Sequence, residues 1–411
     1  MTTIKTSVLA TAAALTAFAS GAFAMDVDVY GVVDLGMHWT NSNTSKHAFV
    51  MDSGITKGSR VGMRGKENLG GGYSAIFNLE TGFNADTGEF DNTSNRLFNR
   101  GASLGISAPW GKVEMGRLGA LGSGVTGSIF LNGFTPFGNL YKESQALQII
   151  NHQVMRADNM VRFESASMAG VKLYAEYSNG VSGDDSVRSS QKDRFAAVGA
   201  TYQNGPFGLV FVADNYFYNN VDNAYFGRDD SQTYNLGARY RLKDVTFYAA
   251  YQYGHKVEKL GNQMKKPGSK DATGNTKKDG SGNPTETKYD NQGFNSNAFV
   301  VGLKAKALGG ELKLQGGYAH GTSNSDSAKF EYHRSNGTLR NTTYKNTHVK
   351  ADVWQVAVGY NYPLSKSTYL YASAAYVDRS YKENGVEVTG TDTKPKTDTV
   401  KSAMFGLCHS F

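Results

Sequence analysis

The sequence has little cysteine and little proline, with 1 Cys and 7 Pro among 411 residues. A single cysteine excludes a disulfide framework and a zinc site built on cysteines. After residue 24, no stretch offers the roughly 20 consecutive apolar residues that a membrane-spanning helix needs. The 8 histidines show no metal-ligand spacing such as H-x-x-x-H, so we expect no metal site.

The chain is instead rich in glycine and aromatic residues, with 48 Gly, 24 Tyr and 22 Phe. Disordered chains lack aromatic residues, so this composition favours an ordered protein. Abundant glycine with so little proline is typical of many strands joined by tight turns.

The first 24 residues resemble a secretory signal peptide. Lys5 provides the positive charge, Val8–Phe18 form a short apolar core, and Ala22–Ala24 form an A-x-A cleavage site before Met25. A transmembrane anchor is the alternative, but the apolar core is short and interrupted by Thr. We therefore expect residues 1–24 to be removed and residues 25–411 to form one exported domain. Export argues against nucleic acid as a partner.

Alternation with a period of two is the dominant pattern of the exported chain. Between Val27 and Trp39 the odd positions are mostly apolar, whereas Asp28, Tyr30, Asp34 and His38 lie between them. Such alternation predicts a strand with two unlike faces. The pattern recurs at 73–80, 172–177, 351–359 and 403–411.

Short and long links alternate along the whole chain, which sets the number of strands. The seven short links are 68–73, 107–112, 166–171, 203–208, 242–245, 307–311 and 362–365. The eight long, polar links are roughly 40–57, 84–95, 119–156, 179–192, 218–230, 255–292, 321–349 and 379–397. Together they imply 16 strands, and all seven prolines fall in links, as strand hydrogen bonding requires.

An even number of strands, with short turns at one end and long loops at the other, is typical of an outer-membrane barrel. A soluble sandwich would also alternate but would not combine these features with a signal peptide. We therefore predict an all-β fold, a 16-stranded antiparallel transmembrane β-barrel. Barrels of about sixteen strands leave an aqueous channel. The third long link, 119–156, is unusually apolar, so we expect it to fold inward; a lid over the outer rim is the alternative.

Several motifs in order resemble the Gram-negative general porin family, most closely the porins of beta-proteobacteria. They cover nearly the whole exported chain: Val29–Asp34, Gly58–Gly72, Leu97–Arg100, Met115–Arg117 and Asp158–Phe163. The resemblance implies a homotrimer of water-filled barrels in the outer membrane, without a cofactor. It also implies that Phe405, Leu407 and Phe411 form the signal read by the outer-membrane assembly machinery.

The resemblance further implies that the third link forms the pore constriction. The stretch Thr135–Asn139 is similar to a Pro-Glu-Phe-Gly-Gly motif of enterobacterial relatives but lacks its acid. The constriction residues of the link would then be Pro136, Phe137, Gly138 and Glu143. Because Glu143 is the only carboxylate between residues 119 and 156, the acidic side of the constriction is weak.

Strand parity predicts which charged side chains face the lumen. Val61 and Met63 face lipid, so Arg60, Arg64 and Lys66 face water. Val161 and Phe163 likewise face lipid, so Arg162 and Glu164 face water. The resemblance adds a wall arginine at Arg100, although Ala102, Leu104 and Ile106 share its parity and look lipid-facing. The predicted basic wall is Arg60, Arg64, Arg100 and Arg162, and the other lumen residues are Asp34, His38, Lys66, Glu80 and Glu164.

A basic wall facing few acids predicts weak to moderate anion preference, because rings of charge set which ion concentrates in a pore. Each arginine could instead be an ordinary solvated lumen residue. Arg117 has lipid-side parity, and in relatives a similar arginine serves the subunit interface; Glu89 or Asp91 is its candidate partner here.

A passive channel for ions and small hydrophilic solutes is the leading functional hypothesis. A substrate-specific channel, with the aromatic third link as a sliding surface, is the alternative within transport. A non-conducting barrel acting as an adhesin or envelope anchor is the alternative from another class. An enzyme is not expected, since no nucleophile and base combine convincingly. The lysine-rich link 255–292 could contact lipopolysaccharide, or be a solvated loop.

Overall fold

The structure is a computed structural model of the chain, and most of the chain after residue 24 is described. The described residues are 25–43, 47–91, 96–182, 188, 191–219, 230–261, 264–265, 277–278, 284–286, 293–333, 338–387 and 397–411. The expected signal peptide, 1–24, lies outside them, as does most of the link 255–292. Among the described residues, no helix is long and apolar enough to cross a membrane.

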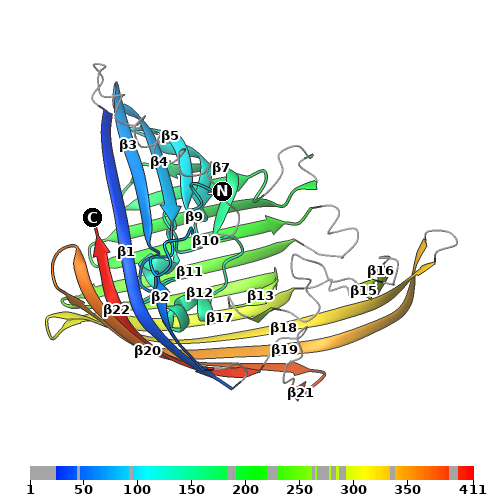
Figure 1. Cartoon of the computed structure of the whole chain (residues 1–411). Helices are drawn as coiled ribbons and strands as arrows, with labels where there is room; N and C mark the ends of the chain where they lie inside the picture. The colour runs from blue at the N-terminus through cyan, green and yellow to red at the C-terminus, as the bar shows by residue number, and fades with distance from the viewer. Residues whose placement is uncertain are drawn as a thin grey trace, which may run out of the picture.

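Sixteen long strands form the wall of the molecule (Figure 1). They are β1 (Met25–Ser42), β3 (Arg60–Gly70), β4 (Tyr73–Gly82), β5 (Gly101–Ala108), β6 (Gly111–Gly119), β7 (Arg156–Ser165), β8 (Val171–Ser178), β9 (Arg194–Asn204), β10 (Phe207–Phe217), β11 (Ser231–Leu242), β12 (Val245–Val257), β17 (Phe294–Ala307), β18 (Gly310–His333), β19 (Thr338–Pro363), β20 (Thr368–Glu383) and β22 (Asp398–Ser410).

The strands close into a ring in which every neighbour is antiparallel. Each long strand pairs with the next along the chain, and β1 closes the ring by pairing with both β3 and β22. At the closure Val29 lies opposite Met63, and Leu35 lies opposite Leu407. The predicted 16-stranded antiparallel barrel is thereby confirmed. Closure leaves no unpaired sheet edge, as a lipid environment requires.

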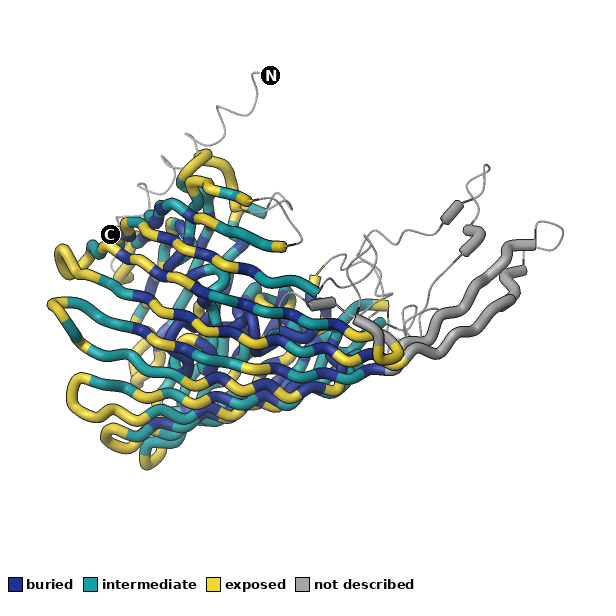
Figure 2. The backbone as a smooth tube through the Cα atoms, turned by 90° about the horizontal axis from the view of Figure 1, so that it is seen from below, coloured by how far each residue is buried: buried dark blue, intermediate teal, exposed yellow. Residues whose placement is uncertain are grey.

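Exposed and buried residues alternate along many of the strands (Figure 2). In β7, for example, Val161 and Phe163 are 49% and 36% exposed, whereas Arg162 between them is 5% exposed. The exposed apolar side chains form an outward belt, and the opposite parity faces the interior of the ring. The parity that the sequence predicts for this strand is therefore confirmed.

Tight turns join the strands at one end of the ring. Between β17 and β18 the link is two residues long, and both Leu308 and Gly309 have positive φ, at 50° and 80°. Two such residues in succession match the twist of the strands that they connect, and glycine adopts this conformation without strain.

The predicted link 321–349 is wrong in its extent. β18 and β19 continue to pair through most of it, as far as His333 opposite Thr338. Alternation of apolar residues marks a strand only where one face meets lipid, so a strand that continues beyond the membrane carries no such pattern.

Three other long links contain short strands, which the sequence did not reveal. In link 40–57, β2 (Ala48–Ser53) pairs with the C-terminal half of β1. The remaining short strands are β13 (Lys259–Leu260), β14 (Met264–Lys265), β15 (Lys277–Lys278), β16 (Pro284–Glu286) and β21 (Val386–Glu387).

Candidate functional site: the inner wall and the third link

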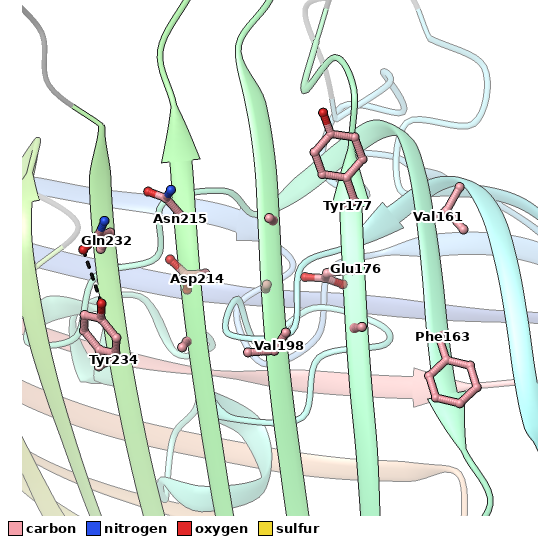
Figure 3. A pocket seen from close by; sticks show the side chains of 13 residues that line it. Val161, Phe163, Glu176, Tyr177, Val198, Asp214, Asn215, Gln232 and Tyr234 are labelled. Atoms are coloured by element: carbon pink, nitrogen blue, oxygen red, sulfur yellow. Dashed lines mark hydrogen bonds between the residues drawn. The ribbon is translucent and has the colours of Figure 1, made fainter.

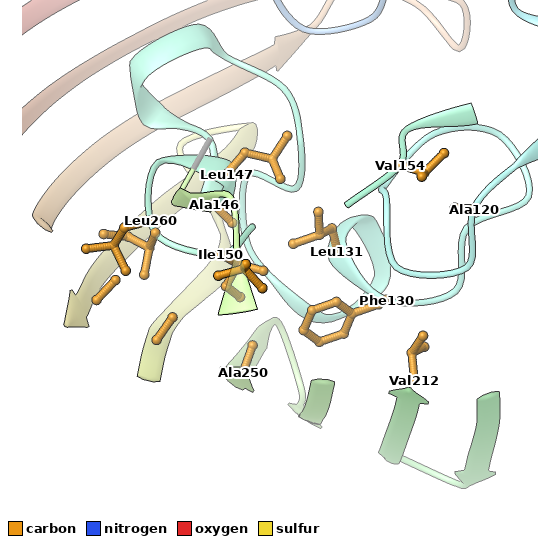
Figure 4. Close-up of a cluster of buried hydrophobic side chains, with 14 of the residues drawn as sticks. Ala120, Phe130, Leu131, Ala146, Leu147, Ile150, Val154, Val212, Ala250 and Leu260 are labelled. Carbon is orange, nitrogen blue, oxygen red and sulfur yellow. The ribbon is translucent and has the colours of Figure 1, made fainter. Parts of the chain in front are cut away.

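The third link (residues 119–156) packs its apolar side chains against one side of the inner wall (Figure 4). It contains α2 (Leu131–Phe134) and two 3₁₀ turns, η1 (Lys142–Ser144) and η2 (Ala146–Gln148). The buried apolar residues of the link include Leu121, Phe130, Leu131, Leu147, Ile149 and Ile150, and their wall partners include Val210, Val212, Ala250 and Val300. All four wall residues have the parity opposite to the exposed belt, so the link covers the inward face of β10, β12 and β17.

Polar contacts fasten the later part of the link to β18 and β19, the next strands of the ring after β17. The Gln315 amide of β18 donates to the carbonyl of Ser144 at 3.2 Å, and the Gln355 amide of β19 donates to the carbonyl of Gln145 at 3.0 Å. Both glutamines are almost fully buried. The sequence analysis did not identify these two glutamines as contacts of the link. The only signal they offer is a polar amide at an inward-facing position of a strand.

Glu143 is not a free acid at the edge of a pore. Its carboxylate lies 2.9 Å from Nε2 of His38 in β1, while Nδ1 of the same ring lies 3.4 Å from Asp52. Lys142 bonds to Asp52 at 2.9 Å. Burial raises the pKa of the Glu143 carboxyl, but the hydrogen bond and charge of His38, with further hydrogen bonds, together outweigh burial, so the net pKa is below its ordinary value. Glu143 therefore serves to hold the link against β1 and β2.

Phe137 is also not a surface for solutes, because it is only 2% exposed. Its ring meets that of Tyr141 edge-on, with centroids 5.3 Å apart. It occupies the space above Gly359, where an added Cβ would come within 2.7 Å of the ring. Phe130 and Phe134 are equally buried. The aromatic sliding surface suggested by the sequence is therefore wrong, since packing against the wall removes these rings from solvent.

Pro136 and Gly138, the predicted constriction residues on either side of Phe137, are each fixed by local geometry. Gly138 has a φ of 60°, which glycine adopts without strain. Pro136 lies beside Gly302 of β17, where an added Cβ would meet its ring.

Arg162 does not belong to an open basic wall. Its guanidinium bonds to Glu176 of β8 at 3.0 and 2.6 Å, and to the carbonyls of Gly119 and Gly127 at the start of the third link. Glu176 also accepts the Leu121 N–H at 2.8 Å. Both charged side chains are at most 5% exposed. The prediction of lumen parity is correct, but the role is wrong, because a buried guanidinium requires partners.

Two predicted wall arginines, Arg60 and Arg100, do come together. They share the buried carboxylate of Glu80, which lies 3.3 Å from Arg60 Nε and 2.9 Å from Arg100 Nε. The Tyr30 hydroxyl donates to the same carboxylate at 2.9 Å, and Arg100 reaches Asp91 at 3.5 Å. Arg100 precedes β5, so strand parity does not apply to it, which resolves its ambiguous assignment.

A third arginine, Arg156, lies within electrostatic range of Arg100 and Glu80. The sequence prediction missed it because residue 156 fell at the end of the third link, where no parity could be assigned. Among the described residues, none forms an ion pair with Arg156. We call Arg60, Arg100 and Arg156, grouped around Glu80, the arginine cluster.

Arg64 borders this cluster: it is paired with Asp28 at 3.3 Å, with both side chains more than 60% exposed, and its guanidinium lies 5.2 Å from the centre of the Tyr30 ring. Arg64 and Asp28 are cross-strand partners of β1 and β3. Both residues lie near the short-turn mouth, and the predicted place of Arg64 in the constriction stays a prediction. Lys66 is also exposed there, whereas Glu164 is paired with Lys172 at 2.8 Å.

Asp34 is fully buried rather than solvated. Its carboxylate accepts hydrogen bonds from the backbone N–H of Thr56 at 2.6 Å and of Lys57 at 2.7 Å, and from the Tyr371 hydroxyl at 2.7 Å. It therefore fixes the chain between β2 and β3. A charge with this many donors is stabilised by them and not by water.

Arg117 is paired within its own chain, but not with the candidates from the second long link. It bonds to Asp158 of β7 and donates to the carbonyl of Asn99 at 2.7 Å. Asp91 bonds to Arg100 instead, and Glu89 is exposed. The prediction of Glu89 or Asp91 as its partner is therefore wrong within the chain, because Asp158 is closer to Arg117 across β6 and β7.

The outward face carries an open, mostly apolar groove over β7 to β11 (Figure 3). Its rim consists of large side chains and its floor of Ala175, Ala196 and Ala213. The rim residues labelled in the figure include Phe163, Tyr177, Val198 and Tyr234, all of which belong to the exposed belt. This groove is separate from the lumen.

Comparison with known proteins places the chain among outer-membrane barrels. A family model described as Gram-negative porin matches residues 10–382. The chain is similar to an outer membrane porin protein of Bordetella pertussis, with 29% identity over 399 residues that cover 91% of this chain and 94% of the relative.

Solved structures show the same fold. The anion-selective porin from Comamonas acidovorans has a TM-score of 0.64 and 20% identity, covering 94% of this chain and 100% of that chain. The trimer form of OmpT from Vibrio cholerae has a TM-score of 0.54 and 16% identity, with coverage of 94% and 100%. The family match over most of the chain, together with the closed barrel, shows that this chain belongs to the Gram-negative porin family.

Proposed function

We propose that this porin conducts small hydrophilic solutes and ions passively across the outer membrane, with a preference for anions. The arginine cluster is the observation that carries the preference. Two guanidinium groups contact the buried carboxylate of Glu80 and that of Arg156 lies within electrostatic range of it, so positive charge exceeds negative charge there even with Asp91 at the edge. Fixed charge in a narrow passage concentrates ions of the opposite sign.

The third link adds little negative charge to oppose the cluster. Its carboxylate, Glu143, is engaged by His38. In this proposal the link narrows the lumen from the opposite side, with its apolar side chains packed against the wall. The anion-selective porin from Comamonas acidovorans shares the fold, which is consistent with the same preference here.

A trimeric relative of the same fold exists, and we propose a homotrimer with Arg117 near the subunit interface. The terminal residues Phe405, Leu407 and Phe411 are exposed on the outward face, and Phe411 exchanges two backbone hydrogen bonds of 3.0 Å with Gly31. We propose that they present the signal for the assembly machinery. Contacts with membrane lipid and lipopolysaccharide would involve the outward belt.

A planar bilayer experiment tests the channel and its selectivity together. The refolded porin is inserted under a KCl gradient, and the reversal potential is recorded for the wild type and for Arg60→Gln. Anion preference in the wild type that declines in the variant supports the proposal. A cation-selective wild type would contradict the role of the cluster, and a folded barrel without conductance would contradict the channel and favour an adhesin or anchor.

A further inference from the structure

A second group of cations lies on the inner wall, on strands remote in sequence from the arginine cluster. Lys304 of β17 and Lys313 of β18 are direct cross-strand partners and both have inward parity. On the next strands along the ring, Arg239 of β11 lies opposite Tyr248 of β12. The Lys304 ammonium is 5.6 Å from the centre of the Tyr248 ring. The four residues thus form one row across β11, β12, β17 and β18, which we call the lysine row.

Two like charges directly opposite each other destabilise a sheet. Contacts within the fold stabilise the charge of Lys313, which donates to the Tyr141 hydroxyl at 2.9 Å and lies 4.4 Å from the centre of that ring. In the described part of the chain, Lys304 has no such hydrogen-bonded partner. Among the described residues, no carboxylate forms an ion pair with Lys304, and its side chain remains partly exposed toward the lumen.

Negative charge near the row is limited. The described carboxylate closest to the pair is Glu311, 3.8 Å from Lys313 Nζ and itself 44% exposed. Lys57 also lies within electrostatic range of Lys313, and Arg239 within range of Lys304. Arg239 is held in place by bonds to the Gly133 carbonyl at 3.2 Å and the Gln203 side chain at 2.8 Å. The row therefore holds an excess of positive charge on a fixed frame.

We propose that the lysine row is a second anion-binding site, between the third link and the short-turn end of the lumen, which takes small multivalent oxyanions such as phosphorylated or polycarboxylate solutes. Adjacent ammonium and guanidinium groups stabilise two or more negative charges together far better than a single chloride. Partly exposed Lys304 would make the first contact, and Tyr248 would add a hydroxyl donor. The proposal deepens the anion preference proposed above and rests on a conducting channel.

The test measures block of the open channel by inorganic pyrophosphate added on the side of the short turns, in about 0.1 M KCl, where charge screening is moderate. The variants are Lys304→Gln, Lys313→Gln and the conservative Lys304→Arg. The control is Lys306→Gln on the same strand. Lys306 shares the inward parity, but its side chain is 80% exposed and paired with Asp244 at 3.5 Å.

We expect pyrophosphate to reduce the wild-type current and the half-blocking concentration to rise about tenfold in Lys304→Gln, the loss expected for one charge-assisted contact. Lys304→Arg should keep the block, Lys306→Gln should change it little, and Lys313→Gln should repeat the loss. Unchanged block in Lys304→Gln, or an equal loss in Lys306→Gln, would overturn the site. The reversal potential in KCl alone reports separately on the proposed function, so failure of one is distinguishable from failure of the other.

Discussion

The buried pair of Arg162 and Glu176 should control whether the third link stays on the wall. Removing the guanidinium in Arg162→Met leaves Glu176 buried with one described hydrogen-bond donor, the Leu121 N–H. Breaking one side of a buried pair costs about 3–5 kcal/mol, because the remaining charge is uncompensated. Since the lost bonds include those to Gly119 and Gly127, we expect the cost to appear as local opening at the start of the link.

Hydrogen exchange measured by mass spectrometry reports that opening directly. A loss of about 3 kcal/mol should speed exchange of the protected amides of residues 120–135 by roughly a hundredfold, while the strands remote from the link keep their protection. The double variant Arg162→Met with Glu176→Met should recover much of the loss, because no buried charge remains.

An exposed pair provides the matched control. Lys172 and Glu164 lie 2.8 Å apart, but Lys172 is 41% exposed, and exposed pairs contribute about 0–1 kcal/mol. Lys172→Met should therefore leave exchange in the link nearly unchanged. The reasoning is refuted if Arg162→Met speeds exchange in the link no more than Lys172→Met does. It is also refuted if the double variant exchanges faster than Arg162→Met.

Three further predictions concern the link and the cluster. Ionised Glu143, whose pKa is below its ordinary value of 4.5, should stabilise the link fully above about pH 4.5. This stabilisation should be lost as the pH falls through the folded-state pKa, so the noise of the channel current should rise in acid. Glu143→Gln should show the same noise already at pH 7. Arg60→Gln should lower the ratio of chloride to potassium permeability, and an unchanged reversal potential would contradict this. Gly359→Val should displace the Phe137 ring, whose atoms lie 2.7 Å from the new Cβ position, and destabilise the link by about 1–3 kcal/mol, measurable as faster exchange around residue 137.

The fold could be predicted from the sequence because lipid imposes a strict rule on each strand. Val161 and Phe163 must face outward, and this alone places Arg162 inside. The same rule is silent where no lipid touches the chain, so the extension of β18 and β19 to His333 and Thr338 was missed.

The candidate site was only partly predictable, because parity gives the side of a residue and not its partners. Arg60, Arg100 and Glu80 were placed inside and do come together. Arg162 was placed inside as well, but its charge is used by Glu176 and by carbonyls of the link. Those contacts depend on how residues 119–156 fold across the barrel, which no local pattern in the sequence encodes.

The third link contacts opposite sides of the ring. Its residues contact β7, β8, β10, β11 and β12 on one side and β1, β18, β19 and β20 on the other. A hollow cylinder braced across its diameter resists flattening, whereas an empty one deforms under lateral pressure. The cross-section of this porin should therefore be mechanically stiffest at the height of the link, and its minimum width should be insensitive to bilayer tension.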